Sequence, residues 1–115
     1  MLNIVMLYYK DKKMINGVGV DIVCIKRVEL NIAKKVLSED EMILFENMSL
    51  IRKKEFLSGR FALKEALYKA GIHINFSIMN IKYNDDGSIY LENYPNVKIS
   101  ISHEKDYAIG FAVVS

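Results

Sequence analysis

Cysteine and proline are scarce in this chain, and each scarcity excludes a class of protein. The 115 residues include one cysteine, Cys24, and one proline. A single cysteine allows no intrachain disulfide and no zinc site built from cysteines, so we expect a reducing, cytoplasmic compartment. With one proline and six glycines, collagen-like and proline-rich linker sequences are excluded. The chain also lacks an apolar run of the roughly 18 residues that suggest a membrane span, so we expect no membrane partner.

An excess of charge of one sign is also absent. The chain has 16 lysines and arginines against 14 acidic residues, a net charge of +2. Nucleic-acid-binding domains usually carry a larger, clustered surplus, so we expect no nucleic-acid partner. A hydrophobic content of 51% excludes a disordered chain, and the length fits one domain with one core. We expect that domain to span residues 14–115, with residues 1–13 as an N-terminal extension.

The N-terminal half of the chain has the pattern of one strand followed by helices. Residues 15–24 predict a buried strand, rich in β-branched side chains, with glycines that permit a close backbone approach. Residues 26–37 have apolar side chains at helical spacing. Ser38 and Glu41 form a capping box that starts a second helix. A third helix is predicted from Ser49 to Ala70, with a small apolar face suited to close packing on a sheet and Gly71 as its stop.

The C-terminal part has the two-residue period of strands. Residues 78–83 and 88–91 flank the turn sequence Asn84-Asp85-Asp86-Gly87 and predict a hairpin. Residues 97–102 and 107–114 predict two further strands around a polar turn. The order of strand, helices and then strands indicates an α+β fold, with helices packed on a mainly antiparallel sheet.

Asp21 is a candidate functional residue because it lies inside the most apolar predicted strand, Val20-Asp21-Ile22-Val23. A carboxylate in that setting must be paired, bind a metal, or emerge at the end of the sheet. From the pattern alone, metal binding or catalysis is weighed equally with a helix cap or a salt bridge to Lys26 or Arg27. A dinucleotide-binding fingerprint is excluded, since the nearby glycines do not open a helix and the third one is absent.

Glu65 and His103 are weaker candidates when each is taken alone. Glu65 is spaced for an i, i+4 ion pair with Lys69 on a solvated helix surface. His103 ends a predicted strand, where a histidine is more often a surface residue than a catalyst. The neighbouring Ser102 suggests the hypothesis of a serine nucleophile, but adjacency in sequence does not indicate a catalytic triad.

Three segments, in order along the chain, carry a resemblance to a known family. They are Gly17-Val18-Gly19-Val20-Asp21-Ile22-Val23 with Lys26-Arg27-Val28-Glu29 after it, the R-F-x-x-K-E-A-x-x-K-A run within residues 55–70, and Ile99-Ser100-Ile101-Ser102-His103 with Tyr107-Ala108 beyond it. From Met14 to Ser115, the sequence resembles the holo-acyl-carrier-protein synthases, the small trimeric family of 4′-phosphopantetheinyl transferases. The middle segment is the most specific.

The resemblance implies a fold, a reaction and an assembly. Such enzymes move the 4′-phosphopantetheine group of coenzyme A onto a serine of apo-acyl carrier protein, releasing adenosine 3′,5′-bisphosphate, in fatty acid biosynthesis. They need Mg²⁺ and have the 4′-phosphopantetheinyl transferase fold. Their active site lies across a subunit interface, so the resemblance implies a homotrimer.

The resemblance also implies roles for individual residues. Asp21 and Glu65 match the two acids that hold Mg²⁺, and Lys69 matches the lysine near the transferring phosphate. Glu65, directly or through a metal-bound water, is the preferred base for the serine proton, with Asp21 second. Cys24 stands where relatives often have a polar or acidic residue.

Four basic residues match positions that contact the two substrates, and a fifth is a candidate contact. Arg60, Lys64 and His103 match residues that line the coenzyme A site. Arg27 matches the arginine that meets the acidic recognition helix of the carrier protein, and Arg52 is a second candidate contact.

Two other interpretations remain as alternatives. A non-enzymatic α+β nucleic-acid-binding module would show aromatic side chains at stacking positions on strand faces. Residues 107–111 match that pattern poorly, and Asp21 and Glu65 would then have no role. A divergent synthase fold kept only as a subunit of a larger assembly is the third interpretation, and the intact acid pair with Lys69 argues against it.

Overall fold

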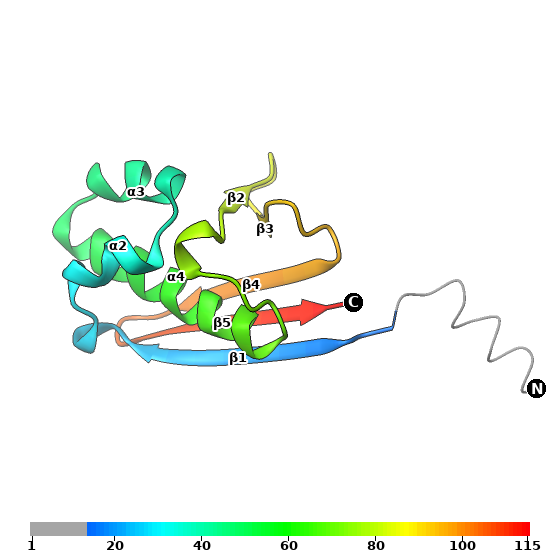
Figure 1. Ribbon diagram of the computed structural model, residues 1–115. Coiled ribbons are helices and arrows are strands. Elements are labelled where there is room, and N and C mark those ends of the chain that lie inside the picture. Colours follow the sequence, from blue (N-terminus) through cyan, green and yellow to red (C-terminus); the bar gives the residue numbers. More distant parts are fainter. Residues whose placement is uncertain (1–13) are drawn as a thin grey trace, which may run out of the picture.

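The structure is a computed structural model that describes residues 14–115, and its elements follow the predicted order (Figure 1). The N-terminal extension expected at residues 1–13 lies outside the described residues. The strands are β1 (Gly17–Cys24), β2 (Ile81–Tyr83), β3 (Ile89–Leu91), β4 (Val97–His103) and β5 (Tyr107–Val114). The helices are α2 (Ala33–Val36), α3 (Glu39–Glu46) and α4 (Leu50–Lys69), with 3-10 turns η1 (Ile25–Arg27), η2 (Leu30–Ile32) and η3 (Phe76–Ile78). None of these helices is long and apolar enough to cross a bilayer.

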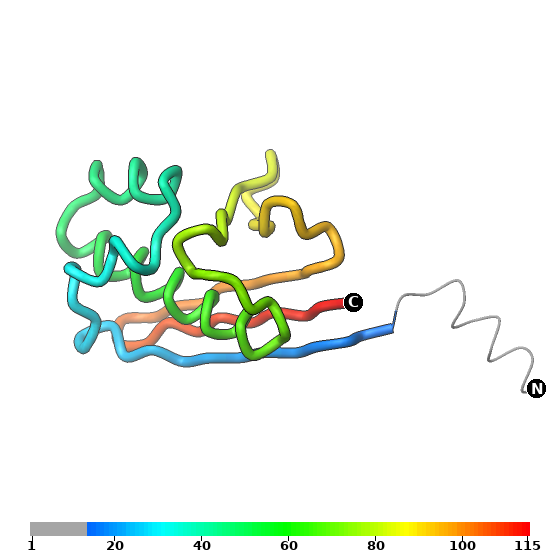
Figure 2. The backbone as a smooth tube through the Cα atoms, in the orientation of Figure 1, coloured from blue at the N-terminus to red at the C-terminus, as the bar shows by residue number. Residues whose placement is uncertain are grey.

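The main sheet has three antiparallel strands in the order β1-β5-β4. The helices lie on one side of this sheet, as the tube in Figure 2 shows. The other side carries exposed apolar side chains. They are Val18, Val20 and Ile22 of β1 with Tyr107, Ile109 and Phe111 of β5, which we call the open sheet face. The prediction that β1 is buried is therefore wrong for one of its faces: Ile22 is 61% exposed, because β1 is an edge strand with helices on one side only.

Helix α4 lies directly on the sheet, as its small apolar face predicts. Glycines of β1 and β5 make this contact possible: a Cβ atom at Gly19 would lie 1.8 Å from the carbonyl oxygen of Ala66, and one at Gly110 would lie 2.3 Å from the backbone nitrogen of Leu63. Ala62, Leu63 and Ala66 are fully buried there. Side chains elsewhere on α4 are therefore held at fixed positions over the strands.

The segment before α3 differs from its prediction. Instead of one helix over residues 26–37, the chain forms η1, η2 and the four-residue helix α2, with extended backbone at Val28 and Leu37. β-branched side chains at 28, 32 and 36 lower helix propensity, and no side chain caps these short pieces. The predicted capping box is present: Ser38 Oγ accepts from the Glu41 amide, and Glu41 Oε1 accepts from the Ser38 amide.

The predicted hairpin forms, but its strands are shorter than expected. β2 and β3 make a separate two-stranded sheet, and of the strand predicted over residues 78–83 only residues 81–83 form β2, while Ile78 ends η3. The hairpin follows α4 in the chain and stands over the same side of the main sheet as the helices (Figure 1). It thereby becomes one wall of a cavity described below.

Candidate active site

Asp21 and Glu65, the two acids predicted to act together, line one cavity. Asp21 is on β1 and Glu65 is on α4, and the close packing of α4 on the sheet brings the two elements together. The cavity has a volume of about 530 Å³, and Cys24 and Arg27 also line it. We call it the acidic cavity.

Lys69 lies one helical turn after Glu65 and interacts with Asp21. Its ammonium is 3.1 Å from Asp21 Oδ1 and 3.2 Å from the carbonyl oxygen of Val20. The pair is open to solvent, with side-chain exposures of 53% for Lys69 and 22% for Asp21. Lys69 is therefore the cation that pairs with Asp21, in place of Lys26 or Arg27, and no ion pair joins Lys69 to Glu65 among residues 14–115.

The donor set of the acidic cavity fits a magnesium ion. Mg²⁺ prefers oxygen ligands and commonly takes one or two carboxylates, with substrate phosphates and water completing its shell. Asp21 and Glu65 supply two such carboxylates on one cavity. In the part of the chain that the structure describes, no group of three or more His, Cys, Asp or Glu side chains could hold a metal. An ion at this site would therefore depend on oxygen atoms from a substrate and from water.

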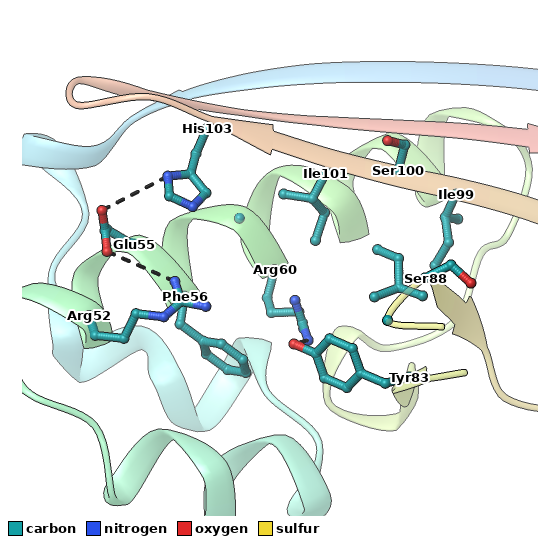
Figure 3. A pocket seen from close by; sticks show the side chains of 13 residues that line it. Arg52, Glu55, Phe56, Arg60, Tyr83, Ser88, Ile99, Ser100, Ile101 and His103 are labelled. Carbon is teal, nitrogen blue, oxygen red and sulfur yellow. Dashed lines mark hydrogen bonds and ion pairs between the residues drawn. The ribbon is translucent and has the colours of Figure 1, made fainter. Parts of the chain in front are cut away.

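A second cavity, of about 350 Å³, lies between the N-terminal half of α4, strand β4 and the β2–β3 hairpin. Figure 3 shows Arg52, Arg60 and His103 around it. Glu55 lies between two of these groups: its carboxylate oxygens are 3.9 Å from Arg52 Nη1 and 3.9 Å from His103 Nδ1. Two arginines, a histidine and one acid give this surface a positive balance, and we call it the basic cavity.

Arg60 is the most constrained of these basic groups. Only 5% of the residue is exposed. Its Nε donates to Glu41 Oε2 at 2.9 Å, and its Nη2 donates to the Tyr83 hydroxyl at 2.8 Å. The guanidinium also lies 4.4 Å from the centre of the Phe56 ring, so its position and its plane are both fixed.

Lys64 lines neither the acidic nor the basic cavity, so its place among the described residues does not support the predicted contact with coenzyme A. Its side chain is 0% exposed and donates to Glu41 Oε1 and to the carbonyl oxygens of Val36 and Phe76. Burial lowers the pKa of Lys64, and the charge of Glu41 partly opposes this shift. The ammonium thus joins α2, α3 and η3 to α4, and it contributes to the packing of the protein interior.

Glu41 makes more contacts than the sequence pattern predicted. The capping box accounts for one of its contacts, but the same buried carboxylate also binds Arg60 and Lys64. One sequence signal was available: Arg60 and Lys64 are four residues apart on one helix face, and two cations there require a nearby acid if that face is covered.

The acidic and basic cavities lie toward opposite edges of the main sheet. Asp21 is on β1 and His103 is on β4, and β5 runs between these two strands. The two cavities share no lining residue. Arg27 and Arg52, both predicted to contact a carrier protein, are separated in the same way: Arg27 lines the acidic cavity and Arg52 the basic one.

Comparison with known proteins decides the family. The sequence model of the 4′-phosphopantetheinyl transferase superfamily matches residues 17–112. The chain belongs to this superfamily. It is 44% identical over 104 residues to the holo-[acyl-carrier-protein] synthase of Mycoplasma capricolum, covering 87% of this chain and 94% of the relative. It is 39% identical over 115 residues to the synthase of Geobacillus sp., covering 88% and 97%. The resemblance to the holo-acyl-carrier-protein synthases is therefore confirmed.

Solved structures confirm the fold. A holo-(acyl-carrier-protein) synthase from Bacillus anthracis, crystallised in complex with CoA (3′,5′-ADP), superimposes with a TM-score of 0.79 at 32% identity, covering 88% of this chain and 96% of that one. The synthase from Neisseria meningitidis superimposes with a TM-score of 0.76 at 27% identity, covering 89% and 99%. The α+β fold with helices on an antiparallel sheet is thus that of the phosphopantetheinyl transferases.

Proposed function

We propose that this protein transfers the 4′-phosphopantetheine group from coenzyme A to a serine of apo-acyl carrier protein and releases adenosine 3′,5′-bisphosphate. The observation that carries the proposal is that Asp21 and Glu65 line one solvent-open cavity and that Lys69 pairs with Asp21, in a chain of this superfamily. The holo-carrier protein would then serve fatty acid biosynthesis in the cytoplasm.

The residues of the acidic cavity suit phosphoryl transfer. Attack by the serine hydroxyl on the β-phosphorus forms a new ester and expels the nucleotide phosphate, so negative charge builds on the phosphate oxygens. Asp21 and Glu65 would hold Mg²⁺, which offsets charge on a diphosphate and stabilises the departing phosphate. Lys69, paired with Asp21, adds a positive charge beside them. Glu65 is our choice for the base that takes the serine proton, with Asp21 second.

The basic cavity suits the nucleotide end of coenzyme A. Arg60 and His103, both predicted to contact coenzyme A, line it with Arg52. We assign Arg52 to the coenzyme A side, since it lies apart from Arg27. We do not assign Lys64 as a contact of coenzyme A, because its side chain is buried. Arg27 keeps its assignment to the carrier protein, since it lines the cavity where the serine must arrive.

A homotrimer would unite the two cavities. A single copy holds them toward opposite edges of its sheet, so the basic cavity of one subunit has to face the acidic cavity of a neighbour for both to meet one coenzyme A molecule. The open sheet face supports such an assembly, because six large apolar side chains on two neighbouring strands are exposed there and exposed apolar patches of this kind mark interfaces.

The open sheet face does not favour the nucleic-acid-binding alternative. Tyr107 and Phe111 are exposed on it, as base stacking requires. However, neither β1 nor β5 contains a lysine or an arginine, and binding to a phosphate backbone depends on such charges. The aromatic side chains on this face therefore suit a protein interface better.

The experiment that tests the proposed function is mass spectrometry of an apo-acyl carrier protein incubated with this protein, coenzyme A and Mg²⁺. We expect the carrier to gain the mass of one phosphopantetheine group, and a chelator to abolish the gain. A carrier that keeps its mass at every Mg²⁺ concentration would refute the proposal, and RNA retention without transfer would favour the alternative.

A further inference from the structure

The guanidinium of Arg60 is held by groups from three different elements. Glu41 of α3 accepts from Nε at 2.9 Å, and Tyr83 of β2 accepts from Nη2 at 2.8 Å. The rings of Phe56, on α4, and of Tyr83 lie 4.4 Å and 5.5 Å from the guanidinium carbon. Figure 3 shows the Arg60 side chain reaching the Tyr83 hydroxyl at the edge of the cavity.

These contacts leave one edge of the guanidinium free. Arginine has five N–H donors, of which Glu41 and Tyr83 take two. Nη1 of Arg60 makes no hydrogen bond within the described residues. Ser58 Oγ is the only fully buried side-chain nitrogen or oxygen without a partner among them. Nη1, which also has no partner, is therefore not fully buried. Nη1 therefore keeps access to the basic cavity that Arg60 lines.

Tyr83 differs from Glu41 in its surroundings. Glu41 is buried and also binds Lys64, so it contributes to stability as well as to the position of Arg60. Tyr83 is 49% exposed on a short hairpin strand. Removing its hydroxyl changes one hydrogen bond to Arg60 and creates no buried cavity, so the effect on the cavity can be separated from an effect on folding.

We propose that Tyr83 and Glu41 are positioning residues that hold Arg60 ready to bind a phosphate group of coenzyme A. The inference rests on the proposed function, because it takes coenzyme A as the ligand. A free arginine side chain loses rotamer freedom when it binds an anion, and a side chain that is already fixed loses less. Tyr83 and Glu41 thus raise affinity for coenzyme A without touching it.

The test compares Tyr83→Phe with Tyr90→Phe. Tyr90 is on strand β3 of the same hairpin and does not line the basic cavity, so its variant is a matched control for the loss of one tyrosine hydroxyl. We expect Tyr83→Phe to raise the KM for coenzyme A and to weaken calorimetric binding of coenzyme A by roughly three- to tenfold. The KM for the carrier protein and the melting temperature should stay at the values of the Tyr90→Phe variant.

Glu41→Gln provides a second test, with Lys64→Met as its control. Both changes remove a buried charge from the same cluster, but Lys64 does not touch Arg60 or the basic cavity. We expect both variants to be less stable and Glu41→Gln alone to weaken calorimetric binding of coenzyme A, at a temperature where both are folded.

Two outcomes would overturn the inference. One is a Tyr83→Phe variant that binds coenzyme A as tightly as Tyr90→Phe does. The other is an equal loss of coenzyme A binding in Glu41→Gln and Lys64→Met. Failure of the proposed function would look different, because the unmodified protein itself would then neither bind coenzyme A nor modify the carrier.

Discussion

The two cavities of this protein are built in opposite ways. The basic cavity has its central cation, Arg60, almost fully buried and bonded to Glu41 and Tyr83. The acidic cavity is lined by Asp21 and Glu65, and an exposed ion pair joins Asp21 to Lys69. A preformed cavity suits recognition of a ligand whose shape is constant, whereas the metal ion proposed for the acidic cavity would take its remaining ligands from substrates and water.

The largest effect should follow loss of either acid. We expect Asp21→Ala and Glu65→Ala each to lower the rate of carrier modification by about a thousandfold or more, because each change removes a carboxylate from the proposed metal site. The melting temperature should change little, since neither carboxylate supports the core. Asp85→Ala, on the exposed turn of the hairpin, is the control. Near-normal transfer in both acid variants would remove the two-carboxylate site.

Two lysines on α4 sharpen the comparison between the cavities. Lys69→Met should lower the rate by about a hundredfold through loss of charge at the phosphate, while the exposed pair it breaks should alter the free energy of unfolding by less than about 1 kcal/mol. Lys64→Met should do the reverse and lower the free energy of unfolding by about 3 kcal/mol, because it leaves a buried cluster short of one charge. Chemical denaturation and steady-state kinetics measure the two quantities. The same ratio of lost stability to lost activity in both variants would contradict the assignment of Lys69 to catalysis and of Lys64 to stability.

A smaller effect is expected at Arg27. Arg27→Ala should raise the KM for the carrier protein by about tenfold through loss of a steering charge, with a smaller change in the KM for coenzyme A. Lys26→Ala is a matched control, since Lys26 is the preceding residue with the same charge and does not line the acidic cavity. Equal changes of both KM values in Arg27→Ala would place this residue outside the carrier contact.

Local sequence patterns predicted the parts of the molecule that are determined locally. The capping box at Ser38, helix α4 with its stop at Gly71, and the close approach at Gly19 follow from residue spacing and backbone geometry. The helix expected over residues 26–37 did not form as one unit, because its apolar spacing was carried by β-branched residues without a cap.

Long-range contacts were beyond the reach of those patterns. The helical period placed Lys64 on the mixed face of α4, but only the packing of α2, α3 and η3 against that face shows that it is covered. The resemblance paired Asp21 with Glu65, and the structure adds that both line one cavity. Separation of this cavity from Arg60 and His103 depends on the strand order, which no residue spacing encodes.

Subunit mixing tests most directly whether each site combines the acidic cavity of one subunit with the basic cavity of another. Asp21→Ala subunits and subunits with both Arg52→Ala and His103→Ala should each be nearly inactive alone. After the two are mixed in equal amounts and allowed to exchange, we expect transfer to recover to roughly a quarter of the unmodified rate, the share of sites that receive two intact halves in a random trimer. Mixed trimers that are as inactive as their parents, with exchange verified by native mass spectrometry, would contradict the shared site.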